Sequence, residues 1–278
     1  MYKNSNFQMR FPGGRPKALT FSYDDGVQQD IRLVSILGRY GLKGTFNINT
    51  GLFRAEGETS RRMTKQQVYD LFAGSPHEVA VHTLTHPWLE RIAPALAAYE
   101  VLEDRRNIEA MFQTVARGMA YPFGTYSDTV VKVLESCGIA YARTTASTER
   151  FDIPADWLRM PATCHHNNPR LFELADLFLN PPRPLDARPP QLFYLWGHSY
   201  EFDDCGNWDV IERFAEKMGG KPDVWYATNI EIYNYVQAYQ RLEFSADGTR
   251  AHNPTATTLF LSVNGSACSI PAGETRAL

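Results

Sequence analysis

The chain has 278 residues, of which 44% are hydrophobic and 21% are charged. This is the composition of an ordinary globular protein and excludes a disordered or fibrous chain. The 28 Lys and Arg residues nearly balance the 31 Asp and Glu residues, so that the formal net charge is −3. No run of basic residues occurs, and we therefore expect neither nucleic acid nor a membrane surface as a partner.

The sequence also carries signals about location. Its longest apolar stretches have the length of a strand, far below the ~20 residues that cross a bilayer. The segment Met1–Pro16 is polar and lacks the apolar region of a secretory signal. The four cysteines form no Cys-x-x-Cys pair, which is typical of reduced thiols in a cytosolic protein. We therefore expect a cytoplasmic protein.

Strand-like and helix-like segments alternate through most of the chain. The predicted strands are Lys17–Tyr23, Gly44–Asn49, Glu78–Val81, Met119–Gly124 (which runs into a turn), Ile139–Arg143, Leu192–Trp196 and Val224–Ala227. The predicted helices run from about Ile31 to Gly41, over Lys65–Phe72, from Pro94 to about Val115, over Asp128–Cys137 and Asp209–Met218, and from about Ile230 to Tyr239. Between Arg143 and Leu192 we expect an irregular, proline-rich stretch.

Several helix ends have recognisable signals. Thr64 and Gln67 form a capping-box pattern, and Pro94 stands where a first-turn proline belongs. Ser127 can cap the following helix, which Gly138 ends. About seven strand–helix units follow one another, which predicts parallel strands with crossover helices, as in an α/β barrel or an open sheet.

The pattern changes after Gln240. Short β-like runs at Arg241–Ser245, Thr257–Val263 and Ala267–Ile270 are separated by Asp-Gly and Asn-Gly turns. We therefore divide the chain into a catalytic barrel at 1–240 and a small β-rich C-terminal appendage at 241–278.

Polar side chains gather where three predicted strands end, and barrel active sites form at that rim. The first cluster is the acidic turn Asp24-Asp25-Gly26. Two adjacent carboxylates repel each other, and a bound cation is the simplest compensation. The alternative is an Asx turn combined with a helix-capping Asp.

The second cluster contains His82 and His86, which follow directly on a strand. Histidines at i and i+4 share one face of a helical turn, about 6 Å apart, which suits capture of a metal. Two unrelated surface histidines are the alternative. Together with Asp25 they provide two imidazoles and one carboxylate, a set that suits Zn²⁺ with a position left open. The same set also accepts Fe²⁺, Co²⁺ or Ni²⁺.

The third cluster is the lone His198 at the end of the strand Leu192–Trp196. Such a histidine is often a structural residue with satisfied hydrogen bonds. Its place at the rim favours a chemical role.

Taken together, these motifs resemble those of the polysaccharide deacetylases, carbohydrate esterase family 4. The acidic turn, the His-Thr-x-x-His motif, the segment Tyr121-Pro122-Phe123-Gly124 and the strand-end His198 come in the order of the family, and the resemblance spans about Lys17 to Tyr239. It implies a distorted (β/α)7 barrel, in agreement with the number of units counted above.

The resemblance also implies roles for single residues. Asp25, His82 and His86 would bind a divalent metal ion, and Asp24 would be the general base and His198 the general acid. The backbone N–H of Phe123, which follows Tyr121 and Pro122, would help to bind the oxyanion and the substrate.

The chain departs from the family in places. Ala120 stands where the third motif usually has an Arg that orients the catalytic Asp, and Arg143 is our first candidate for a replacement, with Arg159 as the second. Each is otherwise a structural or surface arginine. The pair Asp156-Trp157 matches the family's fourth motif in letters but lies far beyond the preceding strand.

Other residues are weaker candidates for the substrate site. His166 either lines that site or belongs to a plain loop. Trp88, Tyr126 and Trp196 either stack on sugar rings or pack in the core.

We expect a metal-dependent hydrolase that removes N-acetyl groups from an amino sugar or oligosaccharide and releases acetate. The lack of a secretory signal favours a small intracellular substrate. One alternative is a hydrolase of another C–N bond, in a cyclic imide or ureide, on the same fold. The other is a catalytically silent carbohydrate-binding barrel, although such a protein would be expected to have lost Asp24 or His198.

Overall fold

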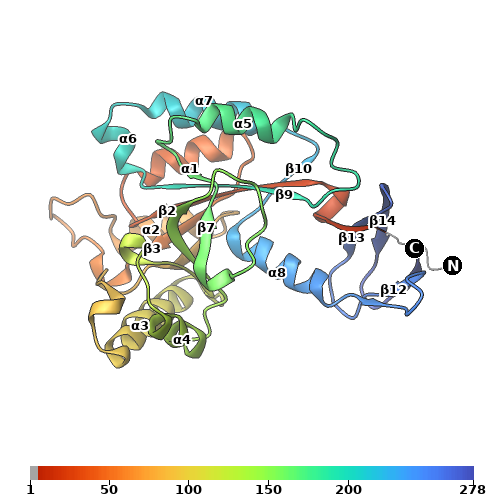
Figure 1. Cartoon of the computed structure of the whole chain (residues 1–278). Coiled ribbons are helices and arrows are strands. Elements are labelled where there is room, and N and C mark those ends of the chain that lie inside the picture. Colours follow the sequence, from red (N-terminus) through yellow and green to blue (C-terminus); the bar gives the residue numbers. More distant parts are fainter. Residues whose placement is uncertain (1–5) are drawn as a thin grey trace.

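The protein is built around a ring of parallel strands, seen in a computed structural model that describes residues 6–278 (Figure 1). The strands are β2 (Lys17–Asp24), β3 (Thr45–Ile48), β4 (Glu78–Val81), β5 (Gly118–Ala120), β6 (Tyr141–Ser147), β7 (Met160–Ala162), β8 (Cys164–His165), β9 (Gln191–Gly197) and β10 (Val224–Tyr226). Their order is β7-β6-β5-β4-β3-β2-β9-β8, with β10 added beside the first half of β2.

The two ends of this order meet, because β7 and β8 are separated only by Thr163. The N–H of Thr163 donates to the carbonyl oxygen of Tyr194 in β9, at 2.9 Å. One stretch of chain therefore pairs with β6 at its start and with β9 at its end. The wall consists of β2 to β6, the β7–β8 stretch and β9, which confirms the predicted distorted (β/α)7 barrel.

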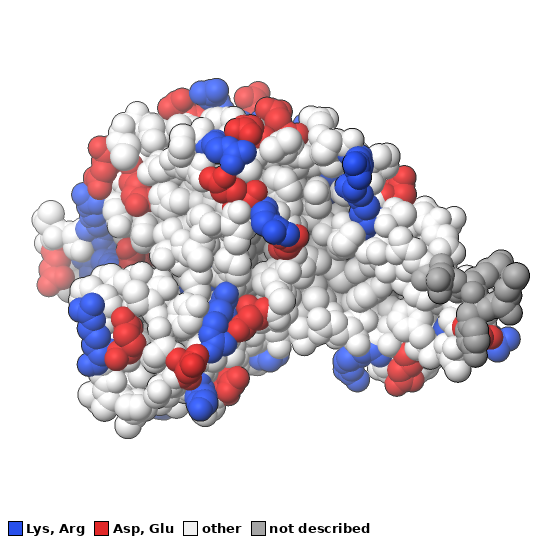
Figure 2. All heavy atoms as spheres, in the orientation of Figure 1, with Lys and Arg blue, Asp and Glu red and all other residues white. Residues whose placement is uncertain are grey.

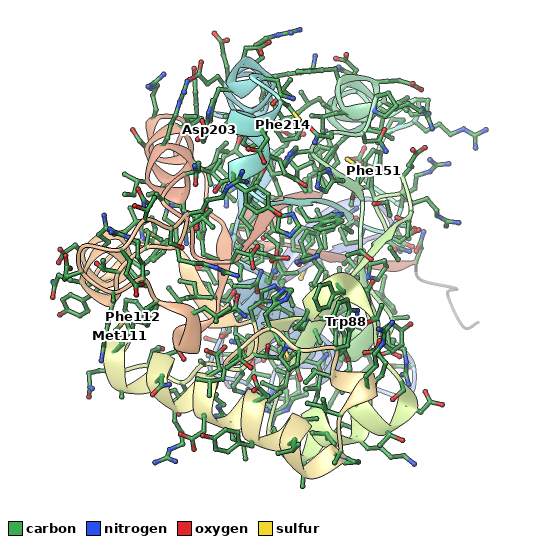
Figure 3. The ribbon with its side chains drawn as sticks, turned by 90° about the vertical axis from the view of Figure 1, so that its left-hand side faces the viewer. Trp88, Met111, Phe112, Phe151, Asp203 and Phe214 are labelled. Carbon is green, nitrogen blue, oxygen red and sulfur yellow. The ribbon has the colours of Figure 1, made fainter. Side chains whose placement is uncertain are left out.

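Helices cover the outside of the ring. They are α1 (Asp30–Arg39), α2 (Lys65–Phe72), α3 (Pro94–Phe112), α4 (Asp128–Ser136), α5 (Leu171–Leu179), α6 (Tyr200–Asp204), α7 (Trp208–Met218) and α8 (Asn229–Gln240). In Figure 1, α1, α5 and α7 lie on one side of the strands, and α3 and α4 lie on the opposite side. Phe214 of α7 and Phe151, labelled in Figure 3, belong to the apolar layer under α5 and α7.

The helix-start signals work as the sequence predicts. The hydroxyl of Thr64 accepts from the Gln67 N–H at 3.2 Å, and the Gln67 side chain accepts from the Thr64 N–H at 2.9 Å. Ser127 caps α4 by accepting from the Val130 N–H. Among the residues that the structure describes, no helix is both long enough and apolar enough to cross a bilayer.

The prediction of an irregular stretch after Arg143 is wrong. That stretch contains β7, β8 and α5. The sequence does not predict β7 and β8 because they have only three and two residues, too few to show an alternating pattern. The sequence of α5, LFELADLFL, is so apolar that a helical period of polar and apolar residues does not stand out.

Two small antiparallel sheets lie beside α8, at the right of Figure 1. The first has the order β1-β13-β14, formed by Phe7–Arg10, Leu259–Val263 and Ser266–Ile270. The second has the order β11-β12-β15, formed by Glu243–Phe244, Arg250–His252 and Thr275–Ala277. The C-terminal segment is thus held by an N-terminal strand as well. The division at residue 240 stays a prediction, and the first five residues of its barrel part lie outside the described residues.

Charged side chains are spread over the face seen in Figure 2, where blue and red groups alternate without a large area of one sign. Many form pairs, such as Arg159 with Asp128 and Arg170 with Glu173. This distribution agrees with the small net charge of −3.

Candidate active site at the carboxyl ends of the strands

Asp24 ends β2 and is buried, with 3% of its surface exposed. Its Oδ1 accepts from Asn47 Nδ2 at 2.8 Å, and its Oδ2 forms an ion pair with the guanidinium of Arg143. Burial alone would raise the pKa of Asp24, but the Arg143 guanidinium, together with the nearby imidazoles of His82 and His198, outweighs burial and lowers the pKa to about 2. Asp24 is therefore a carboxylate at neutral pH.

The next residue, Asp25, points elsewhere because its backbone is in the left-handed region, with φ at 86°. Its Oδ1 lies 3.9 Å from the Nε2 atoms of both His82 and His86. Arg62 Nη2 approaches the same oxygen to 3.0 Å. The two adjacent carboxylates thus have different partners, one facing an arginine in the barrel and the other facing two imidazoles.

His82 follows β4, and its ring is fixed by the backbone. Nδ1 lies 2.8 Å from the carbonyl oxygen of Ala120, which can only accept, so Nδ1 carries the hydrogen and Nε2 keeps a free lone pair. The Nε2 atom is buried and has no hydrogen-bond partner. Burial lowers the pKa of His82, which favours the neutral ring.

The predicted helical turn between His82 and His86 is wrong. The backbone of Thr83 and of His86 is left-handed, with φ values of 68° and 60°. The His86 N–H donates to Thr83 Oγ1 at 3.1 Å, which bends the chain back toward His82. The two rings still meet, with centroids 4.8 Å apart. Two causes lower the pKa of His86 to about 4: burial, which is the larger, and the neighbouring His82.

Backbone strain is concentrated at this rim. Seven non-glycine residues among residues 6–278 have a positive φ, and Asp25, Thr83, His86 and Phe123 are four of them. Each such conformation costs on the order of 1 kcal/mol and persists only where surrounding contacts enforce it. Strain of this kind tends to accumulate at functional sites.

The donor atoms of Asp25, His82 and His86 fit a divalent metal ion. All three lie within 4.8 Å of one another. Asp25 Oδ1 and His82 Nε2 are buried atoms without a well-aligned hydrogen bond, which is the state expected of ligand atoms. Two neutral imidazoles and a carboxylate are a common ligand set for catalytic zinc.

His198 comes from the opposite side of the rim, directly after β9. Its Nε2 lies 3.9 Å from Asp24 Oδ2, and its Nδ1 lies 3.4 Å from Glu201 Oε1. Asp24 therefore lies between the two histidine groups, because His82 Nε2 is also 3.9 Å from its Oδ2.

The structure brings one of the two candidate arginines to Asp24. Arg143 is fully buried, donates to Ser22 Oγ at 3.2 Å and pairs with Asp24. Its guanidinium lies 4.5 Å from the centre of the Trp196 ring. Arg159 instead pairs with Asp128 and Asp156 on the surface, each at 2.7 Å. The role of Arg143 stays a proposal, but its position is that of a residue that holds Asp24.

The segment around Pro122 forms a tight turn beside His86. Phe123 has φ at 58°, and its ring meets the His86 ring edge-on with centroids 4.6 Å apart. A Cβ on Gly124 would lie 2.2 Å from Thr145 Oγ1, so only glycine fits there. Tyr121 is buried, and its hydroxyl donates to the Leu158 carbonyl at 2.7 Å. The predicted binding role of the Phe123 N–H stays a prediction.

The remaining aromatic candidates have packing partners. Trp88, labelled in Figure 3, stacks on Phe123 with ring centroids 3.7 Å apart, and the Arg91 guanidinium lies 4.7 Å from its ring centre. His166 is 1% exposed and stacks between Tyr23 and Phe202. Trp196 is buried beneath Arg143. Tyr126 is partly exposed and stacks on Tyr121.

Several residues that hold the site were missed by the sequence analysis. Asp104 of α3 accepts from the His82 N–H at 2.9 Å, and Asn49 donates to the carbonyl oxygens of His82 and Thr83. One signal was present. Asp104 lies on the buried face of α3, together with Ala97, Val101 and Ile108, where an acidic residue is unusual.

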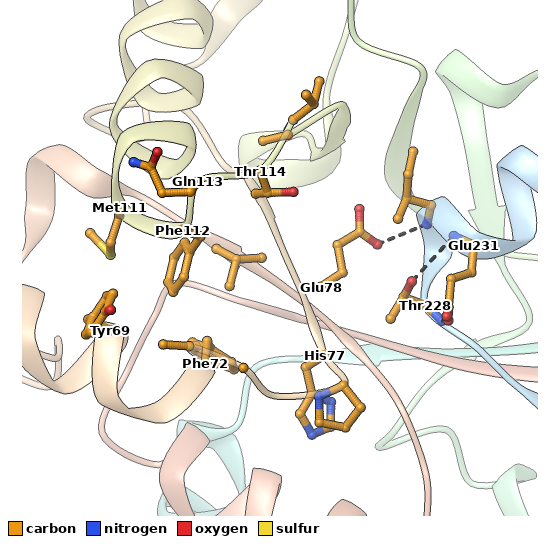
Figure 4. Close-up of a pocket in the computed structure, with 17 residues that line it drawn as sticks. Tyr69, Phe72, His77, Glu78, Met111, Phe112, Gln113, Thr114, Thr228 and Glu231 are labelled. Atoms are coloured by element: carbon orange, nitrogen blue, oxygen red, sulfur yellow. Dashed lines mark hydrogen bonds between the residues drawn. The ribbon is translucent and has the colours of Figure 1, made fainter.

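A cavity of about 490 Å³ lies at the other end of the barrel, where β4 begins (Figure 4). Its wall contains Glu78, His77 and apolar side chains of α2 and α3. None of the candidate catalytic or metal-binding residues contributes to it.

Comparison with known proteins relates both the sequence and the fold to deacetylases. The sequence profile of the polysaccharide deacetylases matches residues 12–142. A chitooligosaccharide deacetylase from Bradyrhizobium sp. (strain ANU 289) is 31% identical over 150 residues, which are 53% of this chain and 61% of the relative. A second, from Sinorhizobium fredii (strain NBRC 101917 / NGR234), is 27% identical over 141 residues, which are 50% of this chain and 59% of the relative.

The chain therefore covers about three fifths of the length of these curated relatives. A solved structure from Mycobacterium smegmatis, assigned to the polysaccharide deacetylases, has a TM-score of 0.57 and 15% identity. The match covers 84% of this chain and 94% of that one and concerns the fold. Sequence and fold both relate this chain to the polysaccharide deacetylases, the sequence through the profile match over residues 12–142 and the fold through the structure from Mycobacterium smegmatis.

Proposed function

We propose that this protein is a metal-dependent hydrolase that removes N-acetyl groups from an amino sugar or short oligosaccharide and releases acetate. The observation that carries the proposal is the position of Asp24. Its Oδ2 lies 3.9 Å from His82 Nε2 on one side and 3.9 Å from His198 Nε2 on the other. A base is thus held between a group of metal-type ligands and a separate imidazole. The printed name of the two relatives, chitooligosaccharide deacetylase, supports the same reaction.

Asp25, His82 and His86 would hold the metal ion, for which Zn²⁺ is our first choice and Co²⁺, Ni²⁺ or Fe²⁺ are alternatives. When bound, such an ion polarises a carbonyl group and lowers the pKa of water at the site.

The protein's own groups would then move the protons. Asp24 accepts the proton of the attacking water at Oδ2, while Arg143 and Asn47 keep this carboxylate oriented. The Phe123 N–H donates to the oxygen that gains negative charge as the water adds to the acetyl carbon. His198 delivers a proton from Nε2 to the nitrogen of the sugar. The C–N bond then breaks, with the amine leaving as a neutral molecule instead of a poor anionic leaving group.

The complete set of Asp24, Asp25, His82, His86 and His198 argues against a catalytically silent barrel. A cyclic imide or ureide substrate would use the same groups, so only a substrate test separates it from an acetylated sugar. The expected cytoplasmic location stays a prediction.

The test is acetate release from N-acetylated sugars of one to six units, with zinc-loaded and chelator-treated protein compared side by side. We expect release only with metal, and the comparison of chain lengths identifies the preferred substrate. Asp24→Asn is the matched variant, because it keeps the shape of the side chain but removes the base. It should bind the same amount of zinc as the wild type and release acetate at least about 10³-fold more slowly.

Two outcomes would contradict the proposal. Release that persists without metal would remove the metal from the reaction. If zinc-loaded protein releases no acetate from any sugar, the substrate must contain a different C–N bond. Cyclic imides and ureides would then be tested.

A further inference from the structure

A second group of titratable side chains lies next to His198. Glu201 of α6 is its centre, and His165 and His166, at the end of β8, reach it from the neighbouring strand. Glu201 Oε2 lies 3.0 Å from His165 Nε2 and 3.2 Å from His166 Nε2, and Oε1 lies 3.4 Å from His198 Nδ1. No motif in the sequence singles out Glu201.

The hydrogen bonds indicate which atoms carry protons. His165 Nδ1 accepts from the Asn167 N–H at 3.1 Å, so the hydrogen of a neutral His165 ring is on Nε2, which donates to Glu201. Burial would raise the pKa of Glu201, but the close imidazoles of His165, His166 and His198 outweigh burial and hold this pKa well below its usual range. Glu201 is therefore an ionised acceptor.

Glu201 contacts His198 at two points. Oε2 accepts from the His198 backbone N–H at 3.2 Å, and Oε1 faces the ring at Nδ1. The intervening Ser199 donates from Oγ to the buried Asp30 of α1 at 2.6 Å, which holds this loop against the barrel. The ring therefore has one nitrogen facing Glu201 and the other facing Asp24, 3.9 Å away.

We propose that Glu201 is the positioning residue for His198: its carboxylate holds the hydrogen on Nδ1 and stabilises the protonated ring, so that Nε2 is aimed at the leaving nitrogen. This inference rests on the proposed role of His198 as the acid. The pair Asp156-Trp157, which matches the family's fourth motif in letters, has partners other than His198. Asp156 accepts from Arg159 and from the Leu158 N–H.

A second metal ion is the competing explanation, since donor atoms of His165, His198 and Glu201 lie within 4.8 Å of one another. The proton on His165 Nε2 argues against it. To bind a metal there, the ring would have to move its hydrogen to Nδ1, where it would face the Asn167 N–H. A positioning role for Glu201 requires only that the 3.4 Å contact between His198 Nδ1 and Glu201 Oε1 closes into an aligned hydrogen bond. The zinc content of the protein distinguishes the two explanations.

The test compares Glu201→Gln with Asp204→Asn, a matched loss of charge on the same helix. Within residues 6–278, the ion-pair partner of Asp204 is the exposed Arg61. Each zinc-loaded protein is assayed with an N-acetylated chitooligosaccharide and with 4-nitrophenyl acetate. The sugar amine needs a proton to leave, whereas 4-nitrophenolate leaves without one. For Glu201→Gln we expect kcat on the sugar to fall about 10²-fold with little change in KM, and hydrolysis of the ester to fall less than about threefold. Asp204→Asn should resemble the wild type on both.

The pH dependence gives a readout that a purely structural role would not change. The titratable groups that face His198 are Asp24 and Asp25 at the end of β2, Tyr200 and Glu201 in α6, and His165 and His166 after β8. Ring NMR signals of His198 in zinc-loaded protein should titrate at least about one pH unit lower in Glu201→Gln than in the wild type.

Three results would overturn the inference. They are an equal loss on sugar and ester, an unchanged His198 titration in Glu201→Gln, and two zinc equivalents in the wild type that fall to one in Glu201→Gln. Failure of the proposed function looks different. The wild type would then release no acetate from sugars, while the NMR titration would still report whether Glu201 acts on His198.

Discussion

Each end of the barrel contains a carboxyl group whose pKa is shifted by its surroundings, and the two pKa values are shifted in opposite directions. At the carboxyl end, Asp24 pairs with the buried cation Arg143, which lowers its pKa to about 2. At the amino end, Glu78 accepts hydrogen bonds from the hydroxyls of Thr45 and Tyr141 and from the Ile230 N–H. Burial raises the pKa of Glu78 to about 7, because no cation compensates for it.

The hydrogen bonding and backbone conformation around Asp24 and Glu78 also differ. Around Asp24 lie buried atoms without hydrogen bonds, on Asp25 and His82, and a backbone with left-handed residues. Around Glu78 every oxygen has a donor, and the nearby helix α8 begins with an ordinary capping box. Unsatisfied atoms and strained backbone therefore distinguish the end where we propose the active site, whereas a titratable group beside a cavity does not by itself mark a site.

The largest difference between the two ends of the barrel is expected when one histidine is removed from each. His82→Ala removes a free Nε2 from the ligand group, and we expect loss of bound zinc and at least a 10³-fold fall in acetate release, of the order seen when a metal site is lost. His77→Ala removes a ring whose Nδ1 accepts from the Gly44 N–H. It should lower stability but leave zinc content and the activity of the folded protein within about twofold of the wild type.

Metal analysis of the two purified variants, together with acetate release, checks this prediction. Equal zinc content in His82→Ala and the wild type would contradict the assignment of His82 as a ligand.

The next largest effect is expected from Arg143, the cation that pairs with Asp24 and has no counterpart beside Glu78 in the described part of the chain. Arg143→Met leaves Asp24 charged and buried without its partner, which should cost about 3–5 kcal/mol in the free energy of unfolding. Activity should fall about 10²-fold, because Asp24 is no longer oriented. Arg159→Met removes an arginine that is paired on the surface, and it should cost less than about 1 kcal/mol.

Thermal unfolding and acetate release of the two arginine variants provide the measurement. Equal stability of Arg143→Met and Arg159→Met would show that the buried ion pair contributes little.

The smallest effect is expected at the amino end. The pKa of Glu78 is raised from 4.5 to about 7 in the folded protein, so the stability linked to its protonated form is complete below pH 4.5 and is lost as the pH rises through 7. Glu78→Gln removes this dependence. Relative to the variant, the wild type should lose about 2–3 kcal/mol of stability between pH 5 and pH 8.

Denaturant unfolding at several pH values tests this, with acetate release as the control, which should stay unchanged. A constant difference in stability across this pH range would mean that Glu78 is ionised throughout.

Some of this protein could be predicted from residue types and spacing alone. Strand and helix positions emerge from hydrophobic periodicity and caps, as for β4 and α2, whose bounds match the prediction. Asp25, His82 and His86 could also be found, because residues that follow parallel strands collect at one rim whatever the detailed packing is. The sequence failed where local patterns are weak, in the apolar α5 and in the left-handed loop of His86.

The folded structure distinguishes Arg143 from Arg159 and shows which groups Asp104, Asn49 and Glu201 contact. The physical reason is that most of these contacts join residues far apart in the chain, and their distances depend on strand tilt, register and the closure of the ring. The contact of Glu201 with His198 is local, but its contacts with His165 and His166 are not. Arg143 reaches Asp24 across 119 positions of sequence, from β6 to β2. Residue spacing carries no information on such a pair, whereas packing makes it the central ion pair of the site.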